Sequence, residues 1–314
     1  MTIARPSRRA DLRVVYLGTS EFAVAVLNRL ADSPFRPVLV ITPPDRPKGR
    51  GRRVGAPPAA LAARELDLPL HQADSVNRPE AVDAVRAASA ERGVVCAFGQ
   101  LISEPLLSEL PMLNVHPSLL PRWRGAAPIE RTIMAGDGET GVTIIQVAAG
   151  FDSGPMALRE RVEIEPRDDY GSLSDRLAKL GGKLIVRALE LDAAGELQFA
   201  EQDEAEVTYA EKITAADRRL DPGRPAVELA RAVRALNPHI GAGLDLEGGG
   251  RLRVRGATAE PGELDPGALV AEGGVLRLGC AEGALRIEEV QPAGGRPMAA
   301  EAYLRGHPAP RLAS

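Results

Sequence analysis

Residues 12–44 of the chain read LRVVYLGTSEFAVAVLNRLADSPFRPVLVITPP. The apolar run 12–18 ends at a glycine and is typical of a buried strand. Residues 19–34 predict a helix, because Ser20 is a suitable N-cap residue and apolar side chains follow it at helical spacing. The run 36–44 is a second apolar strand. A strand, a helix and a strand in this order predict an α/β fold with a parallel sheet.

The next hundred residues repeat this alternation. Helices are expected at 58–69 and 81–93, and strands at 93–102 and 112–116. We therefore expect a doubly wound, Rossmann-like parallel sheet whose site lies at the carboxyl ends of its strands. The first strand is followed by GTSEFA, which lacks the G-x-G-x-x-G fingerprint, so a dinucleotide site is not expected.

The sequence pattern changes near residue 190. A long helix or helix pair is expected at 170–195, and a polar, acidic connector follows at 198–213. After a helix at 225–238, short strands separated by Gly and Pro predict a small, OB-like β-barrel. The predicted organisation is a catalytic domain at 1–191, a linker at 192–206 and a β-barrel domain at 207–314.

Composition narrows the class of protein. The 314 residues carry a net charge of −4, which does not indicate a nucleic-acid binder, although local clusters matter more than the sum. Cys96 and Cys280 are far apart and show no metal-ligand spacing, which favours a reducing compartment. Neither a signal-peptide core nor an apolar run of ~18 residues is present. We expect a cytoplasmic protein without a metal.

Two stretches carry candidate catalytic residues. In MLNVH, Asn114 and His116 are two positions apart on a strand, so they face the same side, and Pro117 stops the strand there. Asp152 follows an apolar strand in the turn GFDSG. The alternative is that none of them is catalytic: the Asn would be a capping residue, the His a surface residue and the Asp an ordinary turn residue. If the Asp lies beside the His, it would keep the imidazole oriented and charged for proton transfer.

These residues, with SLLPRWRGAAPI and GFDSG around them, resemble the formyltransferase family that uses 10-formyltetrahydrofolate. The resemblance implies that Asn114, His116 and Asp152 are catalytic. It also implies that the folate co-substrate is bound by Phe98, Gly99, Ser118, Leu119, Leu120 and Pro121. Ser20 stands where the family has proline in the opening motif, a departure that concerns the geometry of the turn.

Within this family the rest of the chain resembles the methionyl-tRNA formyltransferases. The segments TYAEKITAADRRLDP, RALNP and VQPAGGRPM match their second domain, and TPPDRPKGRGRRVGAP matches their basic loop. The loop, whose Gly and Pro residues disfavour a fixed helix or strand, is expected to bind tRNA through Arg46, Lys48, Arg50, Arg52 and Arg53. Arg251, Arg253 and Arg255 alternate along one predicted strand and are further candidates. The alternatives without tRNA binding are that the loop is a solvated run of charges and that the three arginines protect an edge strand.

The resemblance implies transfer of a formyl group to the α-amino group of methionyl initiator tRNA, for initiation of translation. We expect the protein to act as a monomer. A formyltransferase acting on a sugar nucleotide or another small amine is one alternative, and an RNA-binding module without catalysis is another.

Overall fold

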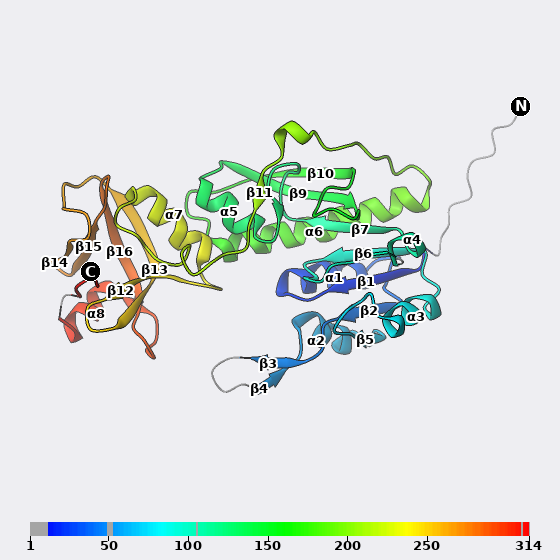
Figure 1. Cartoon of the computed structure of the whole chain (residues 1–314), viewed down its shortest axis with the longest axis horizontal. Coiled ribbons are helices and arrows are strands. Elements are labelled where there is room, and N and C mark those ends of the chain that lie inside the picture. The colour runs from blue at the N-terminus through cyan, green and yellow to red at the C-terminus, as the bar shows by residue number, and fades with distance from the viewer. Residues whose placement is uncertain (1–11, 49–52, 105, 309, 314) are drawn as a thin grey trace, which may run out of the picture. The chain divides into compact units, whose positions relative to one another are not determined.

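The computed structural model describes residues 12–48, 53–104, 106–308 and 310–313. The chain forms two compact units that interleave along the sequence (Figure 1). The first comprises Met1–Gly125, Thr140–Val162 and Ser174–Tyr209, and the second comprises Ala126–Glu139, Glu163–Leu173 and Ala210–Ser314. Each unit is made of three separate segments, so the units do not test the domain boundaries expected at 191 and 207, which stay a prediction.

The secondary structure follows the predicted alternation. The helices are α1 (Glu21–Ala31), α2 (Pro58–Glu65), α3 (Pro79–Ala87), α4 (Leu106–Glu109), α5 (Pro128–Ala135), α6 (Tyr170–Ala193), α7 (Ala226–Leu236) and α8 (Ala300–Gly306). The strands before α6 are β1 (Val14–Gly18), β2 (Leu39–Thr42), β3 (Arg46–Lys48), β4 (Arg53–Gly55), β5 (Leu70–Gln72), β6 (Arg92–Cys96), β7 (Met112–His116), β8 (Arg124–Gly125), β9 (Glu139–Gln146) and β10 (Met156–Glu163). Those after it are β11 (Tyr209–Ala210), β12 (Ala242–Leu246), β13 (Gly250–Glu260), β14 (Leu269–Glu272), β15 (Val275–Gly279), β16 (Ala284–Gln291) and β17 (Met298–Ala299).

The first unit is built on a seven-stranded sheet with the order β10-β9-β7-β6-β1-β2-β5. The strands from β5 to β7 are parallel, as predicted. The sheet departs from the predicted parallel arrangement at β9, which runs antiparallel to β7 with His116 opposite Thr143. The chain re-enters the sheet at the end where β7 stops, so β9 runs back along it without a crossover.

Helices cover both faces of this sheet, which confirms the doubly wound, Rossmann-like arrangement. Val15 and Leu17 of β1 pack in one cluster with residues of α3 and α4. On the other face, the Tyr16 hydroxyl donates to the Ala23 carbonyl of α1 at 2.6 Å. The long helix α6 packs closely against β7. A Cβ added at Gly181 of α6 would lie only 2.7 Å from the side chain of Val115 in β7.

The second unit contains a six-stranded antiparallel sheet. Its order is β12-β13-β16-β15-β14, with β17 paired to β16. Leu229, Val233 and Leu236 of α7 are buried in one core with Leu252 and Val254 of β13. The observed antiparallel strands agree with the predicted small barrel-like domain.

The basic stretch between β2 and α2 differs in part from its prediction. It was expected to have no fixed strand, yet β3 and β4 at its two ends form an antiparallel pair, with Arg46 opposite Gly55. An extended conformation suits the fixed φ of Pro47, and the β-branched Val54 favours a strand. Among the helices that the structure describes, none combines the length and apolar character needed to cross a bilayer.

Candidate active site

Strand β7 presents Asn114 and His116 at its carboxyl end. Leu113 and Val115 alternate with them and are 1% and 2% exposed, so the strand is anchored in the core by its apolar residues. His116 is itself 3% exposed, and Asn114 is half-buried. The position predicted from the N-x-H spacing is therefore the observed one, but the histidine is not a surface residue.

Asp152 is brought to the same place by a loop that folds back. The carboxyl end of β9 lies beside the start of β7, with Gln146 opposite Leu113, so Asp152 does not simply continue the strand. Instead, the Gln146 N–H donates to the Pro155 carbonyl at 2.9 Å and closes the intervening loop. Only glycine fits at Gly154, because a Cβ there would lie 1.8 Å from the Gln146 carbonyl oxygen.

The carboxylate of Asp152 joins three parts of the chain. Its Oδ1 accepts a hydrogen bond from Asn114 Nδ2 at 3.1 Å, and its Oδ2 accepts one from the Gly125 N–H at 3.0 Å. The same Oδ2 lies 3.5 Å from Nδ1 of His116, an ion-pair distance. Asn114, His116 and Asp152 thus form one cluster.

Both ring nitrogens of His116 face acceptors. Nδ1 faces the Asp152 carboxylate, and Nε2 lies 2.9 Å from the carbonyl oxygen of Trp123. Neither neighbour has a hydrogen to give, so each ring nitrogen can interact with its neighbour only as a donor. Trp123 and Asp152 also have φ values of 66° and 47°, in a region that side chains other than glycine rarely adopt. Such backbone conformations are concentrated at functional sites.

The predicted folate residues after β7 form a tightly held turn. Ser118 and Leu120 are fully buried and Pro121 is buried, whereas Leu119 is half-buried. Thr143 of β9 binds this turn twice: its hydroxyl donates to the Ser118 carbonyl at 2.7 Å and accepts from the Leu120 N–H at 3.1 Å. The side chains of Ser118 and Leu120 therefore shape the turn from inside, and Leu119 is the more accessible member.

The other two predicted folate residues follow β6. Phe98 is 3% exposed, and its carbonyl accepts a hydrogen bond from the Thr19 hydroxyl at 2.7 Å. Gly99 has a φ of 74°, and a Cβ placed on it would meet no atom within 4 Å. The backbone at Gly99 thus faces open space, where a flat ligand could approach it.

Three residues of this neighbourhood were not predicted from the sequence. Arg124 is 3% exposed, and its Nε donates to Oε1 of Gln202 at 2.9 Å. Gln202 is 8% exposed and also contacts the Asp152 loop. The Thr208 hydroxyl accepts from the Trp123 N–H at 2.9 Å. Two of these residues lie in the acidic stretch expected to be a connector, where no periodic pattern marks them.

The predicted tRNA-binding residues lie outside this cluster. Arg46 is exposed, and Nη2 is 3.8 Å from the Asp74 carboxylate, a loose surface pair. Lys48 and Arg53 are backbone partners in the β3–β4 pair, while Arg50 and Arg52 lie outside the described residues.

The three candidate arginines on β13 have different surroundings. Arg251 lies 3.6 Å from Asp245 and donates to the Arg218 carbonyl, whereas Arg253 is exposed. Arg255 sits where the pairing with β16 shifts register, so the even alternation expected from the sequence is interrupted there.

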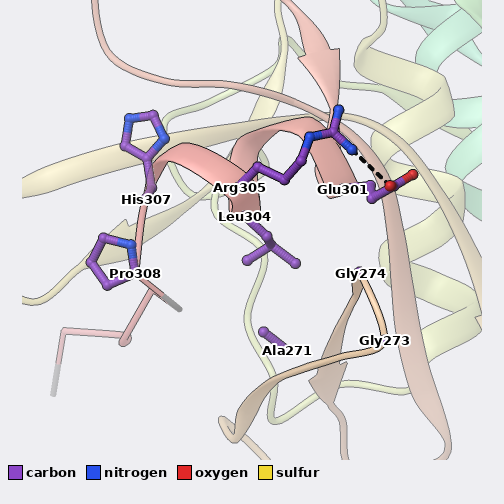
Figure 2. Close-up of a pocket in the computed structure, with 8 residues that line it drawn as sticks. All are labelled: Ala271, Gly273, Gly274, Glu301, Leu304, Arg305, His307 and Pro308. Atoms are coloured by element: carbon purple, nitrogen blue, oxygen red, sulfur yellow. Dashed lines mark hydrogen bonds and ion pairs between the residues drawn. The ribbon is translucent and has the colours of Figure 1, made fainter.

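A cavity of about 580 Å³ in the second unit contains none of the predicted site residues. It lies between the β14–β15 turn and the end of α8, and Figure 2 shows its lining. Its arginine, Arg305, is paired with Glu301 at 2.7 Å, which neutralises the charge locally. Among the residues that the structure describes, no group of three or more His, Cys, Asp or Glu could hold a metal ion.

Comparison with known proteins identifies the family. The formyl transferase family model matches residues 12–189, and the formyl transferase C-terminal domain matches residues 212–308. A methionyl-tRNA formyltransferase of Halorhodospira halophila is 44% identical over 94% of this chain and 96% of its own length. One from Methylococcus capsulatus is 43% identical over 94% and 97%.

A solved structure shares the fold. HypX from Aquifex aeolicus, crystallised in complex with tetrahydrofolic acid, has a TM-score of 0.64 at 16% identity, over 94% of this chain and 47% of HypX. The sequence relatives extend over nearly the full length of both chains, and both formyl transferase domains are present. This chain therefore belongs to the methionyl-tRNA formyltransferases.

Proposed function

We propose that Asn114, His116 and Asp152 act as one catalytic unit that transfers a formyl group from 10-formyltetrahydrofolate to the α-amino group of methionyl initiator tRNA. The observation that carries this proposal is the Asp152 carboxylate, which binds Asn114 at 3.1 Å and lies 3.5 Å from His116. It thereby fixes an amide donor and an imidazole beside each other at the end of a rigid strand.

The reaction exchanges one C–N bond for another. The amine nitrogen attacks the formyl carbon, the bond from that carbon to N10 of the folate breaks, the amine loses a proton and N10 gains one. A free α-amino group titrates near ~8, so the nucleophile needs little activation. The protein's main task is to stabilise negative charge on the formyl oxygen, and each positioned donor contributes ~3 kcal/mol in comparable acyl transfers.

Asn114 and His116 supply these donors. Asn114 Nδ2 uses one hydrogen for Asp152 and has a second for the formyl oxygen. His116 Nε2 donates to the Trp123 carbonyl at 2.9 Å, and the formyl oxygen would replace that carbonyl as acceptor. Catalytic hydrogen bonds often form only in the complex, so this exchange is compatible with the unliganded geometry. Asp152 holds the imidazole in its orientation and assists proton movement from the amine to N10.

The folate would bind beside this unit. Gly99 offers an open backbone surface and Leu119 a half-buried apolar side chain. The buried Phe98, Ser118, Leu120 and Pro121 would support the ligand by holding the two turns in shape. The chemistry that the folate supplies is an activated formyl group on N10.

The tRNA would be bound by basic residues outside the cluster. Arg46, Lys48, Arg50, Arg52 and Arg53 place five cations within eight residues, and residues 207–314 add Arg251, Arg253 and Arg255 after the 192–206 linker. Neutralising phosphates with such residues releases counterions and drives association. The substrate is a charged tRNA used in translation, so we place the protein in the cytoplasm, and we expect a monomer, which light scattering would test.

The decisive experiment is a formylation assay with four acceptors: methionyl initiator tRNA, methionyl elongator tRNA, free methionine and an aminosugar nucleotide. We expect efficient formylation of the initiator tRNA alone. Preferential formylation of the aminosugar nucleotide would assign the chain a small-molecule substrate. Folate binding without transfer to any acceptor would contradict the catalytic proposal.

A further inference from the structure

The segment after α6 returns to the catalytic cluster through one buried glutamine. Gln202 is 8% exposed although its neighbours in sequence, Glu201 and Asp203, are exposed. Its Nε2 donates two hydrogen bonds, to the Asp152 carbonyl at 2.7 Å and to the Gly154 carbonyl at 2.8 Å. One primary amide thus holds both sides of the turn that carries Asp152.

The orientation of this amide is dictated by its partners. Its oxygen faces Nε of Arg124 at 2.9 Å, and a guanidinium can only donate. Its nitrogen faces two carbonyl oxygens, which can only accept. The opposite assignment would place acceptor against acceptor and donor against donor, so a glutamine fits here and a glutamate does not.

Arg124 lies between the residue that binds the main chain of Asp152 and the residue that binds its carboxylate. It is 3% exposed, and its Nη2 pairs with Glu204 at 2.8 Å. The next residue, Gly125, donates its N–H to Oδ2 of Asp152 at 3.0 Å. The main chain of Asp152 is therefore held by Gln202 and its carboxylate by Gly125, and Arg124 links the two holding points.

Asp152 needs such support because its backbone has a φ of 47°. Aspartate adopts this region only at an energetic cost, and the loop would relax if its bonds were lost. We propose that Gln202 is a positioning residue for catalysis: it holds Asp152 at the distance from Asn114 and His116 that formyl transfer requires. This inference rests on the proposed function and assigns a catalytic task to a segment that resembles a plain connector.

The test is the substitution Gln202→Glu, which keeps size and shape but removes both donated hydrogen bonds. We expect a 10- to 100-fold lower kcat, as for other small misplacements of catalytic groups, with folate Kd and tRNA KM within about threefold of the unmodified protein. The matched control is Gln198→Glu, the same change at an exposed glutamine of the same segment, which should leave kcat unchanged.

A double-mutant cycle with Asp152→Asn separates positioning from general damage. If Gln202 acts through Asp152, Gln202→Glu should lower single-turnover rates far less in the Asp152→Asn background than alone. Equal losses in both backgrounds would overturn the proposal, as would a normal kcat for Gln202→Glu. If Gln202→Glu does not fold, Gln202→Leu, which removes the same donors without adding a charge, is measured in the same cycle.

Hydrogen exchange gives a readout independent of the reaction. Peptides covering 147–156 should take up deuterium faster in Gln202→Glu than in the Gln198→Glu control. If deuterium uptake by these peptides were the same in both variants, the proposal that Gln202 holds the Asp152 turn would be overturned. Failure of the unmodified protein to formylate methionyl initiator tRNA would instead refute the proposed function, and the two failures are thus distinguishable.

Discussion

The side-chain nitrogen of Asn114 donates a hydrogen bond to Oδ1 of Asp152 across 3.1 Å, although the residues are 38 positions apart in the chain. Because the same carboxylate lies 3.5 Å from His116, removing any one of the three should disable the unit. We expect Asn114→Ala, His116→Ala and Asp152→Ala each to lower kcat by at least ~100-fold. Steady-state kinetics would measure this, with folate Kd from calorimetry.

Folate affinity serves as the control for these three variants. It should be largely retained, since the three side chains are assigned to the transition state and not to ground-state binding. A variant that keeps near wild-type turnover would lose its assigned role. A variant that loses turnover and folate binding together would point to a binding role instead.

The Gly154 backbone is a second sensitive point. A Cβ added there would lie 1.8 Å from the Gln146 carbonyl, so Gly154→Ala must displace the Asp152 loop. We expect a loss of about 1–3 kcal/mol in the free energy of unfolding and a fall in kcat, measured by urea titration and kinetics. Gly138→Ala, where the added atom meets nothing within 4 Å, is the control and should change neither quantity appreciably. Wild-type activity of Gly154→Ala would show that the loop tolerates displacement.

The basic stretch makes a prediction about salt. Changing Arg46, Arg50 and Arg52 together to Ala should raise KM for tRNA and flatten its logarithmic salt dependence by up to ~3, at roughly 0.7–0.9 per lost phosphate contact. Folate Kd should not change. Filter binding over a range of salt concentrations measures the slope.

The control for this variant is a triple change at three other arginines, all of them exposed. Arg187, Arg224 and Arg305 each pair with a glutamate three or four positions away on the surface. Their replacement by Ala lowers the net charge equally and should leave the salt slope nearly intact. If both triple variants behave alike, the effect comes from overall charge, and the basic stretch is not a specific tRNA contact.

Asp217 predicts a pH dependence of stability in the second unit. The Arg131 guanidinium, 2.7 Å away, and hydrogen bonds from Thr214 lower the pKa of Asp217 to about 2. A carboxyl whose pKa falls on folding stabilises the protein above its unfolded pKa of about 4, and this stabilisation is lost as pH drops towards the folded pKa. Asp217→Asn should therefore be less stable than the unmodified protein at pH 7.

The difference in urea midpoint between these two proteins should begin to shrink below pH of about 4. Asp221→Asn is the comparison, because Asp221 accepts from the Gly223 N–H, a bond that an asparagine oxygen can also accept. It should show no comparable change with pH. A constant difference for Asp217→Asn between pH 7 and 3 would mean that the ion pair with Arg131 does not carry the effect.

Local sequence determined much of this protein. Short apolar runs and helical spacing predict β1, α1, β2 and β7, because burial of apolar side chains acts over a few residues. Pro117 marks where β7 ends, since proline restricts the residue before it, and this places Asn114 and His116 at the sheet's carboxyl edge. The motifs around them were specific enough to indicate the family and the chemistry.

Tertiary structure alone decided how the site is assembled. The antiparallel β9 sends its end away from His116, and only the closed loop between Gln146 and Pro155 returns Asp152 to it. Gln202 lies in an acidic stretch with no periodic pattern, and its burial follows from partners about 50 and 80 positions earlier in the chain. Hydrogen bonds between such distant residues depend on the path of the whole chain, whereas sequence patterns report only which face of a local element is apolar.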